Sequence, residues 1–116
     1  MILELVFSLL RPHIPELYCG HIPQGTKPPF AVISQRTVRT ETTAKLVSLA
    51  DEISLSVWIA ATKVSELQEI TKLVRDVITD SKDEGLIAEF DNDIYNYNPE
   101  SKVHEITQFY KVIVKR

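Results

Sequence analysis

Three histidines and one cysteine are the side chains of this sequence best suited to bind a metal ion or to act as nucleophiles. His13, Cys19 and His21 fall within one proline-rich segment, whereas His104 is far away along the chain. A structural zinc site needs four ligands, and no second close pair completes the set. A nucleophilic Cys19 would need a supporting base whose placement the sequence does not indicate. The simpler interpretation is a small cysteine packed under a loop, with histidines at the surface.

The stretch "DNDIYNYNPE" concentrates oxygen-bearing side chains and is the second candidate for chemistry. An EF-hand calcium loop places oxygen ligands at its first, third and fifth positions and glycine at the sixth. Counted from Asp91, the fifth and sixth positions hold Tyr95 and Asn96, so the match fails. Tyr95 and Tyr97 would share one strand face, but no basic groove accompanies them, which argues against a platform for single-stranded nucleic acid. We therefore predict no catalytic residue, no metal site and no cofactor.

Composition indicates a globular chain with one modest core. The chain has 116 residues, 44% of them hydrophobic and 25% charged, and a formal net charge of −3. This length and balance predict a single domain, residues 1–116, and give no argument for general nucleic-acid binding. The charge is uneven, because residues 1–50 carry five Lys/Arg against three Asp/Glu (+2) and residues 51–116 carry eight against thirteen (−5). Most of the acidic surplus lies between Asp76 and Asp93.

The first residues, "MILELVFSLLRP", are apolar but predict an amphipathic helix rather than a membrane span. The stretch is too short to cross a bilayer and contains Glu4. The single cysteine cannot form an internal disulfide, so nothing indicates an oxidising compartment. We expect a protein that resides in the cytoplasm or belongs to something assembled there.

Hydrophobic periodicity predicts two helices and four strands. A helix is expected at residues 2–10, followed by a proline-rich connection at 11–29 and a strand at 30–37. Alternation predicts a second strand from Ile53 to Ala61, and a stripe of apolar residues predicts a helix within 63–80. Ser65 with Gln68 would form the capping box of that helix. The last third is a hairpin that turns at 98–101. The predicted fold is α+β, an antiparallel sheet with one or two helices packed on it, in the order α-β-β-α-β-β.

Trp58 is unusual because the alternation of its strand places it opposite the apolar face. Two interpretations remain open. The proline-rich segment or a helix could partly cover the ring, or the ring could form a subunit contact, since tryptophan is enriched at interface centres.

This order of elements resembles the tail-completion, or tail-terminator, proteins of long-tailed bacteriophages and related prophages. The resemblance covers the chain through "PPFAVIS", the strand "DEISLSVWIA", the helix "SELQEITKLVRDVI" and the closing strand "HEITQFYKVIV". It implies a structural protein, not an enzyme, that forms a hexameric ring at the head-proximal end of the tail tube. Such a ring ends tail polymerisation and joins the tail-tube protein to the head connector, with DNA only as passing cargo and no membrane. The expected location is the virion tail, after assembly in the host cytoplasm.

The polar segment 36–52, "RTVRTETTAKLVSLADE", gains a meaning from this resemblance. Its flanks can extend both neighbouring strands, which predicts a long hairpin arm with a tip near residues 40–44. We expect the arm to be mobile in the free subunit and ordered against a neighbouring subunit or the tail tube. The expected interface residues are Arg36, Arg39, Glu41, Lys45 and Trp58.

The acidic run has two interpretations. Asp80, Asp83 and Glu84 could line a lumen through which DNA passes without adhering, or the run could be a solvated face. Two other classes of protein also fit the sequence. One is a small oligomeric α+β adaptor or regulatory domain without catalysis, and the other is a small enzyme with its site in residues 11–29.

Overall fold

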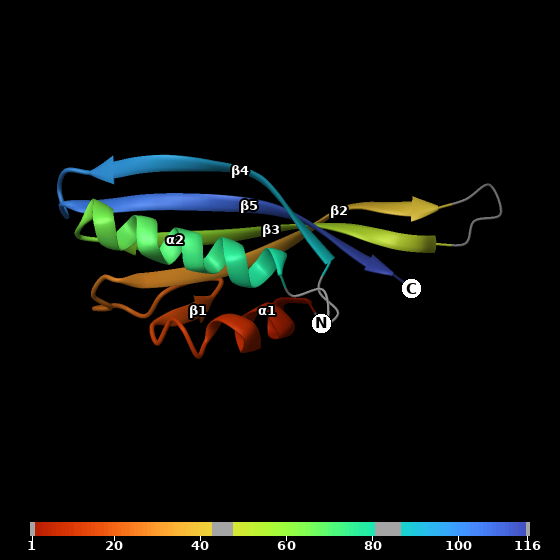
Figure 1. The fold of residues 1–116 in the computed structure, drawn as a ribbon, viewed down its shortest axis with the longest axis horizontal. Helices are drawn as coiled ribbons and strands as arrows, with labels where there is room; N and C mark the ends of the chain where they lie inside the picture. The colour runs from red at the N-terminus through yellow and green to blue at the C-terminus, as the bar shows by residue number, and fades with distance from the viewer. Residues whose placement is uncertain (1, 43–47, 81–86, 116) are drawn as a thin grey trace.

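A computed structural model describes residues 2–42, 48–80 and 87–115 of the chain. The molecule is elongated, with extents of 53 × 26 × 24 Å along its principal axes (Figure 1). Its elements follow one another as α1 (Ile2–Leu10), β1 (Leu17–Cys19), β2 (Phe30–Thr42), β3 (Ser48–Ala61), α2 (Val64–Thr79), β4 (Ile87–Asn98) and β5 (Val103–Lys115).

The strands form one five-stranded sheet in the order β1-β2-β3-β5-β4. Strands β2, β3, β5 and β4 pair antiparallel, so β5 lies between the two strands that α2 connects. The predicted α+β fold and its two helices are confirmed. The sheet is mixed rather than purely antiparallel, because β1 pairs parallel with residues 31–33 of β2. A strand of three residues inside a proline-rich segment is too short to leave an alternation that the sequence could reveal.

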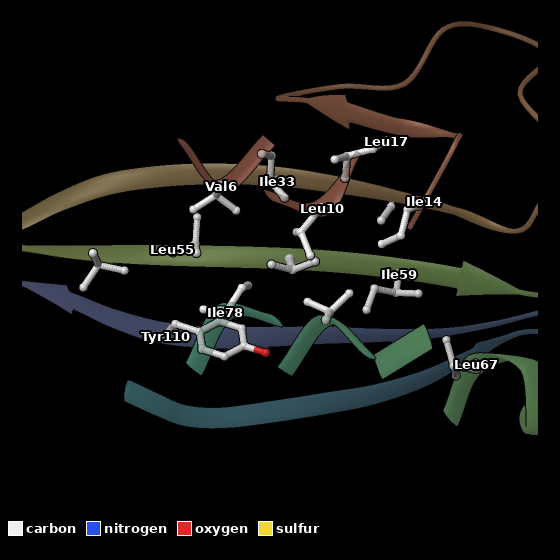
Figure 2. Packing of buried hydrophobic residues seen from close by; sticks show 14 of the residues in the cluster. Val6, Leu10, Ile14, Leu17, Ile33, Leu55, Ile59, Leu67, Ile78 and Tyr110 are labelled. Atoms are coloured by element: carbon white, nitrogen blue, oxygen red, sulfur yellow. The ribbon is translucent and has the colours of Figure 1, made fainter. Parts of the chain in front are cut away.

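Both helices pack on the same face of the sheet, and the main core lies between these two layers. The apolar positions of β3 that the alternation predicted, from Ile53 to Ala61, are all buried there. Figure 2 shows the side chains that converge from both layers: Val6, Leu10, Ile14, Leu17, Ile33, Leu55, Ile59, Leu67, Ile78 and Tyr110. Burial of an apolar side chain of this size contributes about 1.5–3 kcal/mol. The fold therefore depends on one continuous contact between sheet and helices.

Helix α2 begins earlier than the predicted capping box would place it. Its N-cap is Lys63, an extended residue that makes no side-chain capping hydrogen bond, and Ser65 lies inside the first turn. The predicted capping box is therefore wrong. Lys63 follows the end of β3 at Ala61 by only two residues, and its carbonyl accepts from the N–H of the buried Leu67 at 3.0 Å. The first turn of the helix is therefore already closed at Lys63, ahead of Ser65.

The β4–β5 hairpin turns at residues 99–102, one residue later than predicted, and Asn98 is still paired as strand. The Asn98 Oδ1 atom accepts hydrogen bonds from the backbone N–H groups of Glu100 (3.0 Å) and Ser101 (3.4 Å), an Asx turn. Lys102 completes the turn with a φ of 58°. This local chemistry sets the register in which Asn98 pairs with Val103.

A buried polar network ties β5 to α2. Gln108 is 2% exposed, and its Nε2 atom donates to the Thr71 carbonyl at 3.1 Å. The Tyr110 hydroxyl donates to the Gln108 Oε1 atom at 2.9 Å. Burial raises the pKa of the Tyr110 phenol, so this hydroxyl keeps its proton and remains a donor at neutral pH. The amide of Gln108 is thus satisfied at both ends.

Removal of the Tyr110 hydroxyl should destabilise the fold through Gln108. Tyr110→Phe would leave the buried Gln108 Oε1 atom without its donor, so the free energy of unfolding should fall by about 1–2 kcal/mol. The change is measured by urea denaturation. The matched control is Tyr97→Phe on the exposed part of β4, which should change stability by less than about 0.5 kcal/mol. Equal stability of the two variants would contradict this account of the network.

Candidate assembly surface

The β2–β3 hairpin projects beyond both helices and forms the predicted arm. In Figure 1 the two strands continue past the ends of α1 and α2, and β5 accompanies them for part of the way. The pairing runs from Phe30 opposite Ala60 to Thr42 opposite Ser48, and β5 follows as far as the pairing of Lys115 with Ala50. Irregularities in register after residues 37 and 41 increase the local twist. The outer part of the hairpin therefore lacks the helical layer that stabilises the rest of the sheet.

Three of the four predicted interface residues of the arm lie on β2. Arg36 is paired with Ser54, Arg39 with Glu52 and Glu41 with Ala50. Lys45 lies outside the described residues. The predicted tip began slightly too early, because residues 40–42 are still paired as strand. The remainder of that predicted tip, residues 43 and 44, lies outside the described part of the chain.

Trp58 is half-buried on the sheet face opposite the helices. Its ring meets that of Phe30 edge to face, with 5.3 Å between centroids and 65° between planes. The two rings belong to a small second cluster with Val32, Ala60 and Val103 of the sheet. Tyr18 and Ile22 of the proline-rich segment pack against this cluster. The segment thus supplies the partial cover that was one interpretation of Trp58. The part of the ring left exposed is what a subunit contact could use.

The predicted acidic positions are only partly within the described chain. Asp80 is the exposed C-cap of α2, and its backbone N–H donates to the Asp76 carbonyl at 3.0 Å. Asp83 and Glu84 lie outside the described residues. Farther on, β4 carries Glu89, Asp91 and Asp93, all of them exposed.

The structure separates the residues that invited a metal or thiol interpretation. Within the described ranges, no group of three or more His, Cys, Asp or Glu residues could hold a metal ion. Cys19 is at the exposed end of β1, and His13 lies beside the proline-rich loop in a hollow that Ile70 of α2 also lines. Burial raises the pKa of the Cys19 thiol, which is opposite to what a nucleophile needs.

His104 instead belongs to an aromatic cluster that sequence reasoning missed. Its Nδ1 atom lies 2.6 Å from the Tyr95 hydroxyl, and its ring centroid lies 4.7 Å from that of Tyr97. The tyrosines are 53% and 43% exposed respectively. The predicted turn at 98–101 would have set Tyr97 opposite Lys102, and only the observed register, in which Asn98 pairs with Val103, places Tyr97 opposite His104. The arrangement provides an exposed aromatic surface at the end of the molecule opposite the arm.

No described helix has the length and apolar character required to cross a membrane. The features that remain are an arm, a half-exposed tryptophan and an exposed aromatic cluster.

Comparison with known proteins agrees with this description. The family model described as "Tail completion protein gp17" matches residues 6–115. Among solved structures, a chain of the "Virion of native gene transfer agent (GTA) particle" is similar in fold. Its TM-score is 0.63 at 11% sequence identity, over 96% of this chain and 84% of that chain. No curated protein matches the chain significantly.

The match spans nearly the whole chain, and the elements it covers are those that build the sheet, both helices and the arm. The resemblance inferred from the order of elements is thereby confirmed. The chain belongs to the tail completion protein gp17 family and is a structural, non-catalytic component of a phage tail.

Proposed function

We propose that the protein forms a hexameric ring at the head-proximal end of the tail tube, where it ends tail polymerisation and joins the tail to the head connector. The main observation in support of this proposal is the arm. Its strands continue past the ends of the helices and extend the sheet toward one end of an elongated molecule (Figure 1). A hairpin beyond its own core gains little from that core. It is suited to become ordered against a neighbouring subunit or the tail tube.

The distribution of charge supports contact between unlike surfaces. A ring is built from heterologous contacts, in which one patch of each subunit meets a different patch of the next. The first 50 residues carry a surplus of Lys/Arg and the remainder a surplus of Asp/Glu. We therefore assign subunit contacts to Arg36, Arg39, Glu41 and Lys45 of the arm and to the exposed part of Trp58.

The acidic positions Asp80, Asp83 and Glu84 are proposed to face the lumen of this ring. A negatively charged wall repels phosphates, so DNA could pass without adhering to it.

Shortening the arm should impair joining without unfolding the subunit. Deletion of residues 40–45 removes chain beyond the helical layer, so circular dichroism and the melting temperature should stay close to those of the parent protein. Infected cells should then accumulate separate heads and tails, visible by electron microscopy. A substitution of Thr42 by Ser, which keeps the arm length, serves as the control. If the deletion variant gives normal particles, the arm is only a spacer and has no role in joining.

Reversing the acidic positions should slow DNA ejection. The triple variant Asp80→Lys, Asp83→Lys and Glu84→Lys would place cations where phosphates pass, so complete particles should eject DNA more slowly in a fluorescence ejection assay. The matched control is Glu4→Lys, Glu66→Lys and Glu69→Lys, which changes the net charge equally on the helices. Unchanged ejection by the first variant, in particles that assemble normally, would refute the lumen assignment and leave a solvated face.

A further inference from the structure

Strand β4 is a long sheet edge with nothing on its outer side in the described chain. It runs from Ile87 to Asn98, pairs with β5 alone and ends the strand order. Of the five large hydrophobic residues that are exposed in the described chain, four lie on this strand: Ile87, Ile94, Tyr95 and Tyr97. Unpaired edges with apolar side chains are templates for pairing with another chain. The strand therefore has the character of a surface that is covered in the assembly.

The opposite edge of the sheet is also open over most of its length. Strand β1 covers only residues 31–33 of β2, so the stretch from Ser34 to Thr42 has β3 on one side and, in the described chain, no strand on its outer side. One sheet thus offers two unpaired edges on opposite sides, one on β4 and one on β2.

The two edges run in opposite directions. β2 is antiparallel to β3, β3 to β5, and β5 to β4, so β4 runs opposite to β2. A second copy set beside the first without inversion would bring β4 against β2 as an antiparallel pair, the commoner and slightly more stable arrangement. Repetition of that contact extends a single sheet through successive subunits.

The charges of the two edges are complementary, and one acidic position of β4 shares a row across the sheet with one basic position of β2. β4 carries Glu89, Asp91 and Asp93 and no basic residue, whereas residues 34–42 of β2 include Arg36 and Arg39 with Glu41 alone as an acid. One row across the sheet runs from Glu89 through Lys111 and Ser54 to Arg36. Without a shift in height, the next copy would place Arg36 in the row of Glu89.

The ends of the two edges that lie away from the arm also fit each other, here through aromatic and apolar residues. The row of Tyr95 runs through Ile106, Ile59 and Ala31 and ends at Leu17 of β1. The row of Phe30 ends at Asn96 on β4, so Tyr97 lies in the next row. That row is level with Pro28-Pro29, where the proline-rich segment leads into β2. Aromatic surfaces are a common docking site for proline-rich segments. The exposed Tyr95–Tyr97–His104 cluster would therefore meet β1 and the proline-rich segment of the next copy.

We propose that β4 of one subunit pairs antiparallel with the β1–β2 edge of the next, so that the ring closes as a continuous sheet. This inference rests on the proposed ring and identifies which surfaces meet in it. Pairing of two β4 strands with each other would set their acidic residues side by side, which destabilises a sheet. The partner of the β4 edge is therefore a second copy of this chain, which makes the contact through its basic β2 edge.

Cysteine cross-linking in assembled tails tests the contact directly. In a Cys19→Ser background, Glu89→Cys and Arg36→Cys together should yield a ladder of covalent multimers on oxidation, because residues opposed in neighbouring antiparallel strands lie within disulfide distance. If the register between the two copies is shifted by two residues, Glu89→Cys should instead form the cross-link with Ser34→Cys. Each single-cysteine variant should give no ladder.

Two results would overturn the proposed contact. One is covalent dimers from Glu89→Cys alone, which would indicate pairing of two β4 strands. The other is the absence of any ladder, with either partner cysteine, in tails whose terminal ring is visible by electron microscopy. The latter would refute only the edge contact. Tails without a terminal ring of this chain would instead refute the proposed function.

Charge reversal provides a second, independent measurement. Glu89→Arg or Arg36→Glu should weaken association about two- to fivefold at each interface, and the double variant should restore it. The measurement is the salt-dependent fraction of multimers by native mass spectrometry of the full chain, before and after incubation with tail tubes. Glu69→Arg, at an exposed position of α2, is the control with the same charge change. Loss without restoration in the double variant would contradict the pairing of these two rows.

Discussion

The strands rise more than twice as far per residue as the helices that pack on them, and this difference determines the shape of the molecule. The 14 residues of β3 extend about 46 Å at 3.3 Å each, whereas the 16 residues of α2 extend about 24 Å at 1.5 Å each. The helices can therefore bury only part of the sheet. The covered part contains the core, and the remainder becomes the arm. An interior and a projecting contact surface follow from the same mismatch in length.

The two edges of the sheet are the other parts that the helices leave uncovered. The helical layer buries one face of β2, β3 and β5. In the described chain, β4 and most of β2 each have a neighbouring strand on one side only. A soluble monomer usually protects such edges with short strands or charge. This chain places acids on one edge and arginines on the other, a pattern that opposes pairing of like edges while allowing unlike ones to meet. In the proposed ring, that asymmetry would favour contacts that all run in the same direction.

The buried polar network around Gln108 helps to specify how α2 is placed on the sheet, and its hydrogen bonds offset the cost of burying the amide. Gln108 is the buried polar residue of the described core, and its amide is bonded both to Tyr110 and to the backbone of α2. Because each partner comes from a defined position, a shift of α2 along the sheet would leave the amide unsatisfied. The network thus helps to hold the helix, and with it the boundary between covered sheet and arm.

Local patterns in the sequence were informative where their range was short. The alternation from Ile53 to Ala61 predicted the buried face of β3, and Asn98 predicted the turn that sets the β4–β5 register. The same kind of reasoning failed for Ser65, because the start of α2 depends on where β3 ends and on the burial of Leu67. It also missed β1, whose three residues become a strand only because β2 offers them an edge.

The sequence by itself determined the class of fold, the two hydrophobic periodicities, the hairpin that forms the arm and the absence of a recognisable catalytic motif. These properties depend on residues close together in the chain, whose spacing specifies which face of an element is apolar. Only the tertiary structure decided that β5 lies between β3 and β4, that His104 meets Tyr95 and Tyr97, and that Glu89 and Arg36 share a row on opposite edges. The physical reason is that periodicity specifies the face of a strand but not its neighbour, which is chosen by packing among segments distant in the sequence.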